Sequence, residues 1–123
     1  MPVHHALAGP ILVIAVDGDY TQDELHRVTA TGLADTGVPS PARVLLDLSG
    51  AASLDGRTDE ELAATAAFFA DRGEALERVA VLVRGDILQD LMRMGTAFAV
   101  QKGLKASPFR DREEALRWLA EQT

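Results

Sequence analysis

Several side chains that can do chemistry directly follow apolar segments of the chain. Asp17 and Asp19 come after one apolar run, and Asp47 and Ser49 close another. A carboxylate can act as a general acid, a general base or a nucleophile, and a serine hydroxyl can carry a phosphate. In an open α/β sheet the ligand site lies beyond the carboxyl ends of the strands. That rule selects Asp17, Gly18, Asp47, Ser49, Asp55 and Thr58.

The segment from Asp17 to Thr21 resembles the D-x-D-x-T motif of haloacid-dehalogenase-type phosphatases. In that family the first aspartate is the nucleophile and the second is a general acid, which would give these roles to Asp17 and Asp19. The family also needs a lysine between its hydroxyl and magnesium motifs, whereas the only lysines here are Lys102 and Lys105. Aspartate is also common in turns and helix caps that follow strands. We therefore expect no catalytic residues, and a phosphatase is the third of three functional alternatives.

Composition narrows the classes of partner and cofactor. The chain has 123 residues with 19 acidic and 12 basic side chains, so its formal charge of -7 argues against nucleic acid as a partner. Because there is no cysteine, disulfides, thiolate metal sites and cysteine nucleophiles are excluded. His4 and His5 would face opposite sides of a strand, and His26 has no second ligand four residues away. We expect no metal and no cofactor.

Signals for helix starts recur four times along the chain. Each is a short oxygen-bearing side chain followed three residues later by Glu or Gln: Thr21 with Glu24, Thr58 with Glu61, Asp86 with Gln89, and Asp111 with Glu114. They predict helices over residues 21–35, 59–72, 87–101 and 112–121. Apolar segments precede them at residues 11–16, 44–48, 79–83 and 104–109. Strand and helix therefore alternate.

Alternating apolar strands and helices favour a parallel sheet with both faces covered. Residues 3–7 add an edge strand through a hairpin at 8–10. We expect a single α/β domain over residues 1–123, with a four- to five-stranded, mostly parallel sheet and about four helices. The apolar run at 11–16 is too short to span a bilayer, and no charged leader precedes it, so we expect a cytoplasmic protein.

Helical spacing also predicts which side chains enter the core. In the second helix Phe69 belongs to the buried stripe, while Phe68 points about a third of a turn away and is expected to be partly exposed. In the last helix the buried stripe is Ala115, Trp118 and Leu119. The third helix is apolar over two stripes, which is wider than one sheet face requires.

Four segments in order carry a resemblance, over nearly the whole chain, to STAS domains, the SpoIIAA-like fold of anti-sigma-factor antagonists. Residues 44–50 (VLLDLSG) resemble the strand and turn of that fold. Residues 80–83 and 86–94 resemble the strand and the helix of its STAS/SEC14-like branch, and residues 109–119 resemble the F-x-D-x-x-E-A-x-x-W-L ending of that branch. The resemblance implies a SpoIIAA-like fold and a non-enzymatic regulatory or ligand-binding role.

Partner-switching STAS proteins are phosphorylated on a serine that directly follows an aspartate, at the start of the helix after the Asp-Leu-Ser strand. Asp55 and Gly56 take these two places here, so the usual acceptor is absent. Thr58 is the remaining phospho-switch candidate, although its spacing to Glu61 also predicts a helix cap. An anti-sigma-factor-antagonist-type phosphorylation switch is therefore the second alternative.

The SEC14-like side of the resemblance implies an apolar small molecule or lipid, with the helix over residues 86–102 as a movable cover. Basic side chains near that helix predict a patch that suits lipid head groups: Arg84, Arg93, Lys102 and Lys105. The surplus apolar stripe also favours a homodimer or a regulatory protein partner. The candidate ligand- or partner-binding residues are Leu88, Met92, Arg93, Phe98, Asp17, Asp47 and Ser49.

Overall fold

The computed structural model describes residues 3–35, 37–39, 41–51, 59–84 and 103–121, together with positions 93, 97, 100 and 101. Its strands are β1 (Val3–Ala8), β2 (Ile11–Gly18), β3 (Ala42–Ala51), β4 (Leu76–Leu82) and β5 (Ala106–Phe109). The helices with described bounds are α1 (Gln22–Leu33), α2 (Asp59–Ala70) and α4 (Arg112–Ala120), with a short 3-10 turn at Gly73–Ala75. The predicted alternation of strands and helices is confirmed.

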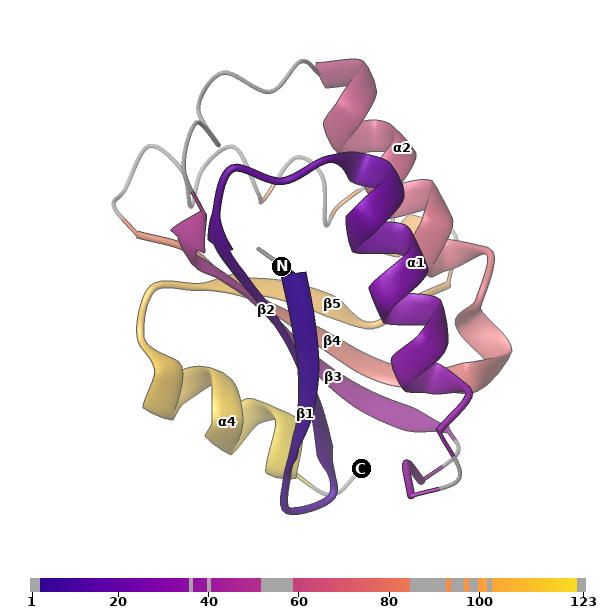
Figure 1. Ribbon diagram of the computed structural model, residues 1–123. Helices are drawn as coiled ribbons and strands as arrows, with labels where there is room; N and C mark the ends of the chain where they lie inside the picture. The colour runs from indigo at the N-terminus through magenta and orange to yellow at the C-terminus, as the bar shows by residue number, and fades with distance from the viewer. Residues whose placement is uncertain are drawn as a thin grey trace.

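The five strands form one sheet in the order β1-β2-β3-β4-β5 (Figure 1). Strand β1 is antiparallel to β2, and all the other neighbouring strands are parallel. Ala8 pairs with Ile11 across a two-residue turn, where Gly9 has a φ of 61° that glycine adopts without steric cost. The predicted edge hairpin and the predicted mostly parallel sheet are therefore both present.

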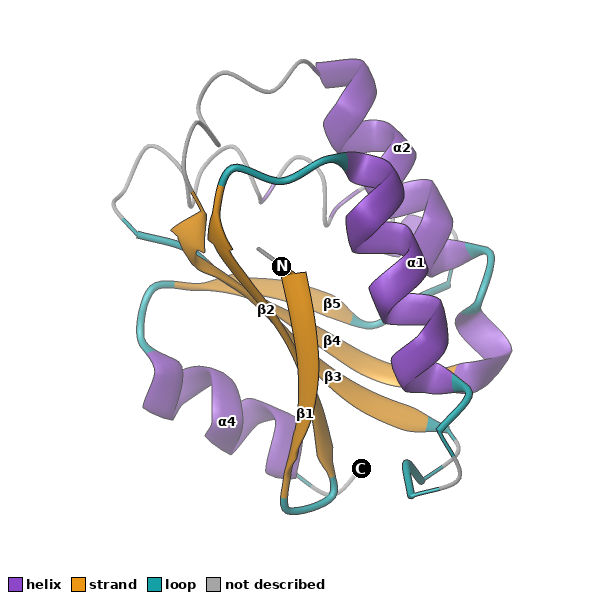
Figure 2. Cartoon of the chain, viewed as in Figure 1, coloured by secondary structure: helices purple, strands orange, loops and turns teal. Residues whose placement is uncertain are grey.

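Helices cover both faces of the sheet (Figure 2). Side chains of Leu12 and Ile14 point to one face, where they join Leu25 of α1 and Phe69 of α2 in a buried cluster. Their neighbour Val13 points to the opposite face and packs in the cluster that contains α4. Burial on both faces explains why the strands read as continuous apolar runs instead of alternating ones.

Two of the four predicted helix starts lie among the described residues, and both are capped. Thr21 Oγ1 accepts a hydrogen bond of 3.1 Å from the Glu24 amide at the start of α1. Asp111 Oδ1 accepts one of 2.9 Å from the Glu113 amide at the start of α4. These bonds satisfy amides that have no partner inside the helix.

The predicted stripe of the last helix is confirmed for two of its three residues. Ala115 and Leu119 are fully buried, whereas Trp118 is only half-buried at the edge of the cluster. The Trp118 ring lies 5.5 Å from the ring of Phe109, and the Arg78 guanidinium carbon lies 5.1 Å from the centre of the indole. Trp118 therefore has one side against the sheet and one side toward solvent.

Most of the predicted helix over residues 86–102 lies outside the described residues. Its four described positions, 93, 97, 100 and 101, are all helical and all exposed. Their spacing of four, three and one places them on one side of a helix, which therefore faces solvent. Within the described ranges no helix is long and apolar enough to cross a membrane.

Candidate functional site

At the carboxyl edge of the sheet, Asp47 is held by contacts to both of its carboxylate oxygens. Ser49 donates to Asp47 Oδ1 from its amide at 3.0 Å and from its hydroxyl at 2.5 Å. Arg112, in the first turn of α4, donates to Asp47 Oδ2 at 3.1 Å. This carboxylate therefore fixes the end of β3 and ties α4 to the sheet.

Asp17 lies on the neighbouring strand β2, at a place where the backbones of β2 and β3 come close together. It pairs with Gly50 where the register between β2 and β3 shifts. A Cβ atom on Gly50 would lie 2.9 Å from the Val16 carbonyl oxygen and 3.2 Å from Asp17 Oδ1, so only glycine fits there without a shift. The structure thus brings three predicted site residues, Asp17, Asp47 and Ser49, to adjacent strand ends. Asp17 is exposed.

The other predicted site residues are less fully described. Leu88, Met92, Phe98 and the phospho-switch candidate Thr58 lie outside the described residues. Arg93 is described and is exposed on the solvent-facing side of its helix.

Two exposed members of the expected basic patch, Arg84 and Lys105, lie far apart in the structure. Arg84 follows the carboxyl end of β4, whereas Lys105 precedes the amino end of β5 and bonds to Val79 through its carbonyl. At about 3.3 Å per residue, these two positions are separated by about 20 Å along the strands. The prediction of one patch is therefore wrong for Arg84 and Lys105.

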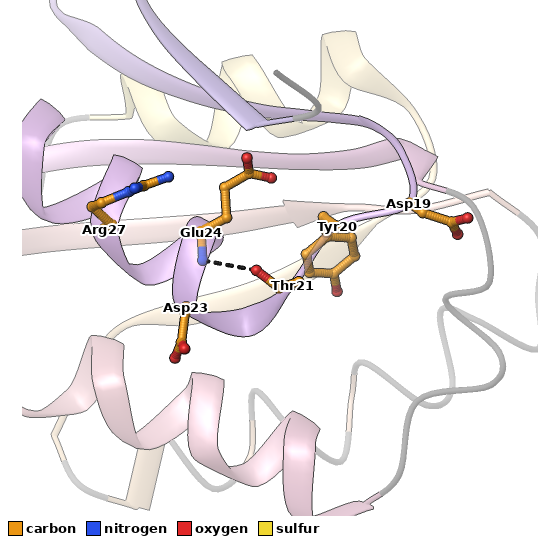
Figure 3. A pocket seen from close by; sticks show the side chains of 6 residues that line it. All are labelled: Asp19, Tyr20, Thr21, Asp23, Glu24 and Arg27. Atoms are coloured by element: carbon orange, nitrogen blue, oxygen red, sulfur yellow. Dashed lines mark hydrogen bonds between the residues drawn. The ribbon is translucent and has the colours of Figure 1, made fainter.

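A hollow of about 440 Å³ opens at the start of α1 (Figure 3). Its lining consists of Asp19, Tyr20, Thr21, Asp23, Glu24 and Arg27. The three carboxylates point in different directions in Figure 3, and Thr21 is engaged as the helix cap. No cluster of acidic or histidine side chains in the described part of the chain could hold a metal ion.

A stack of three side chains joins α1 to the end of α2. The His26 and Phe68 rings are 4.2 Å apart and nearly parallel, and the Arg72 guanidinium carbon lies 3.6 Å from the centre of the Phe68 ring. Groups this close to one ring must lie on its opposite faces. His26 Nε2 is also 3.3 Å from Thr65 Oγ1. His26 is therefore partly exposed and at the same time held in contacts with α2.

The environment of His26 disfavours its charged form. Burial lowers the pKa of His26 first, the positive charge of Arg72 lowers it further, and the negative charge of Asp23 opposes both. The unfolded chain therefore binds more protons than the folded chain as the pH falls through the unfolded pKa of about 6.5.

We expect the stability of the wild-type protein to fall more steeply between pH 7.5 and pH 5.5 than that of the His26→Gln variant. The contribution of neutral His26 is present above the unfolded pKa and is lost as the pH falls through the lower folded pKa. Urea unfolding followed by circular dichroism at four pH values measures the difference. Because both proteins keep His4 and His5, parallel pH profiles would show that this stack does not couple folding to protonation.

A second hollow, of about 540 Å³, lies at the opposite, amino edge of the sheet. Its lining consists of Arg78, Val100, Gly103, Leu104, Lys105, Ala106, Ser107, Trp118 and Glu121. Val100 belongs to the exposed side of the helix predicted over 86–102, and 51% of its surface is accessible. We name this feature the amino-edge hollow.

Arg78 forms the inner wall of the amino-edge hollow. The residue is only 6% exposed, and its Nη1 donates to the Trp118 carbonyl at 2.7 Å and to Glu121 Oε2 at 3.3 Å. Arg43, its neighbour on β3, donates to the Leu119 carbonyl and to both oxygens of Glu77. Both arginines thus satisfy carbonyls at the carboxyl end of α4, where cations are favoured.

Sequence reasoning did not select Arg78 as a site residue. One local signal was present, since Arg43 and Arg78 each come just before the apolar run of a strand. A charged side chain at that place is expected to be buried only with partners. The partners of Arg78 are 40 and 43 residues away along the chain, so the sequence spacing did not indicate them.

The strand order, the flanking helices and the terminal α4 define an α/β module of the STAS type. The sequence matches the SpoIIAA-like family over residues 11–120, and the chain belongs to that family. A solved structure from Shewanella loihica PV-4 is described as an uncharacterized protein from the DUF3478 family with a SpoIIAA-like fold. It matches with a TM-score of 0.64 and 19% sequence identity, covering 96% of this chain and 92% of that chain. No curated protein matches the chain.

Proposed function

We propose that this protein is a non-catalytic binding module that holds a small, partly apolar molecule in the amino-edge hollow, beside Val100. The observation that carries the proposal is the exposure of Val100 at the rim of this hollow. A concave surface lined by apolar side chains together with a few polar groups is the usual arrangement of a small-molecule site. Leu104 and Trp118 supply further apolar surface.

The carboxyl edge of the sheet supports binding over catalysis. Asp47, which could serve as a base or nucleophile, has one oxygen on Ser49 and the other on Arg112. Asp19 lines an acidic hollow that would repel a phosphate ester, and Asp17 is not part of that lining. A phosphatase would need these two aspartates at one site with a cation to hold the phosphate.

Native mass spectrometry of the full chain, purified from its host without detergent, tests the proposal. We expect a species that carries the mass of a retained small molecule, and we expect Val100→Asp to abolish it. Ala97→Asp is the matched control, because Ala97 lies on the same exposed side of the helix but does not line the hollow. A dimer without added mass, lost in both variants, would contradict the proposal in favour of a second copy as partner.

A further inference from the structure

The net charge of the side chains around the amino-edge hollow is positive, whereas the net charge of the whole chain is negative. Among the residues that the structure describes, Arg43, Arg78 and Lys105 face two carboxylates, Glu77 and Glu121. The cluster therefore has a formal charge of +1, on a chain whose net charge is -7. The pKa of Glu77 is lowered, chiefly by its hydrogen bond from Arg43 and then by the nearby charges of Arg43, Arg78 and Lys105.

Among the described residues, Arg78 has one buried donor without a hydrogen-bond partner and one loosely held carboxylate partner. Its Nε is buried and has no hydrogen-bond partner among the described residues. Its one carboxylate partner, Glu121, bonds at 3.3 Å and keeps 62% of its side chain exposed, so that pair is loosely held. A guanidinium prefers a carboxylate that accepts two parallel hydrogen bonds, and Glu121 does not supply this geometry.

The lining of the hollow contains both polar and apolar side chains. Arg78 lies under the indole of Trp118, and Lys105 and Ser107 supply an exposed ammonium and a hydroxyl at the same wall. Val100 supplies exposed apolar surface, whereas Leu104, also in the lining, is only 4% exposed. A ligand that matched both surfaces would have one anionic group and a short hydrocarbon portion.

We infer that the amino-edge hollow binds a small monocarboxylate with a short apolar chain, whose carboxylate takes the place of Glu121 on Arg78 and contacts Lys105. This inference rests on the proposed binding function and adds the chemical class of the ligand. The competition with Glu121 predicts the direction of one effect. Replacing the Glu121 carboxylate by a neutral amide weakens the competing acceptor and removes a negative charge, and both changes tighten binding of the ligand carboxylate.

The single tryptophan of the chain lines the hollow, so its fluorescence reports directly on occupancy. We expect hexanoate to produce a saturable change in Trp118 fluorescence in full-length protein from which any retained molecule has been removed, as native mass spectrometry verifies. Hexanol, which lacks the charge, and acetate, which lacks the chain, are expected to bind at least about tenfold more weakly. Equal affinity for hexanoate and hexanol would overturn the assignment of an anion site.

Three substitutions test whether the carboxylate of hexanoate binds beside Arg78 and Lys105. We expect Lys105→Gln to weaken hexanoate binding by about two- to fivefold and Glu121→Gln to strengthen it by a similar factor. Arg84→Gln is the matched control, since Arg84 is an exposed cation at the far edge of the sheet and is expected to change nothing. Equal effects of Lys105→Gln and Arg84→Gln, or weaker binding in Glu121→Gln, would contradict the inference.

The two proposals can fail separately. If hexanoate does not bind while the host-purified protein carries a different added mass, the ligand class is wrong and the binding function stands. If hexanoate binds with the expected order of variants while the host-purified protein is a dimer without added mass, the anion site stands and the proposed function is wrong.

Discussion

Replacing Phe69 by alanine is expected to lower the free energy of unfolding by about 3–5 kcal/mol. Phe69 is 4% exposed and packs in the buried cluster between α2 and the sheet, in contact at its edge with the ring of Phe68. Removal of the ring loses its transfer free energy and leaves a cavity that the neighbouring strands can fill only in part. Urea unfolding at constant m-value measures the loss.

Phe68→Ala is the matched control, because it deletes the same ring one position earlier on the same helix. Phe68 is half-buried between His26 and Arg72, so we expect a loss of about 1–2 kcal/mol, from partial burial and the stacked pair. Equal losses for the two variants, or a larger loss for Phe68→Ala, would mean that α2 does not pack on the sheet through Phe69.

Leu119→Ala is expected to cost about 2–5 kcal/mol of unfolding free energy. Leu119 is fully buried in the cluster on the second face of the sheet, where α4 is the helix that covers β3, β4 and β5. Leu116 lies one turn earlier and is only partly buried, so Leu116→Ala should cost about 1 kcal/mol. If Leu119→Ala cost no more than Leu116→Ala, the docking of α4 through this residue would be wrong.

The parts of the fold that depend on local pattern could be predicted from the sequence. Continuous apolar runs bounded by capping residues predicted the strands, the starts of α1 and α4 at Thr21 and Asp111, and the parallel sheet. Helical spacing alone separated Phe69 from Phe68. The edge hairpin followed from Gly9 and Pro10 between two apolar segments, because glycine can take the positive φ that this turn requires.

The parts that depend on contacts between distant segments could not be predicted in this way. Asp47 was predicted to bind a ligand, yet it bonds to Arg112, which is 65 residues away and reaches it only because α4 folds onto the second face. Arg78 and Trp118 are 40 residues apart. Spacing along the chain describes which face a side chain takes, but it carries no information about the element that lies opposite.

In the candidate site, too, some features follow from local sequence pattern and others depend on contacts between distant segments. Burial of the strands explains why the charged residues inside them, such as Arg78, need distant partners. Of the helix predicted over residues 86–102, Val100 is described and borders the amino-edge hollow. The predicted residues Asp17, Asp47 and Ser49 lie together but at the opposite edge of the sheet.

The central claim is that this SpoIIAA-like protein binds a small molecule beside the helix that carries Val100. Native mass spectrometry of the host-purified wild type, Val100→Asp and Ala97→Asp proteins, recorded side by side, is the most direct measurement. We expect the added mass of one small molecule on the wild-type and Ala97→Asp proteins and its absence from the Val100→Asp protein. A wild-type protein that is a bare monomer, or a Val100→Asp protein that retains the same added mass, would contradict it.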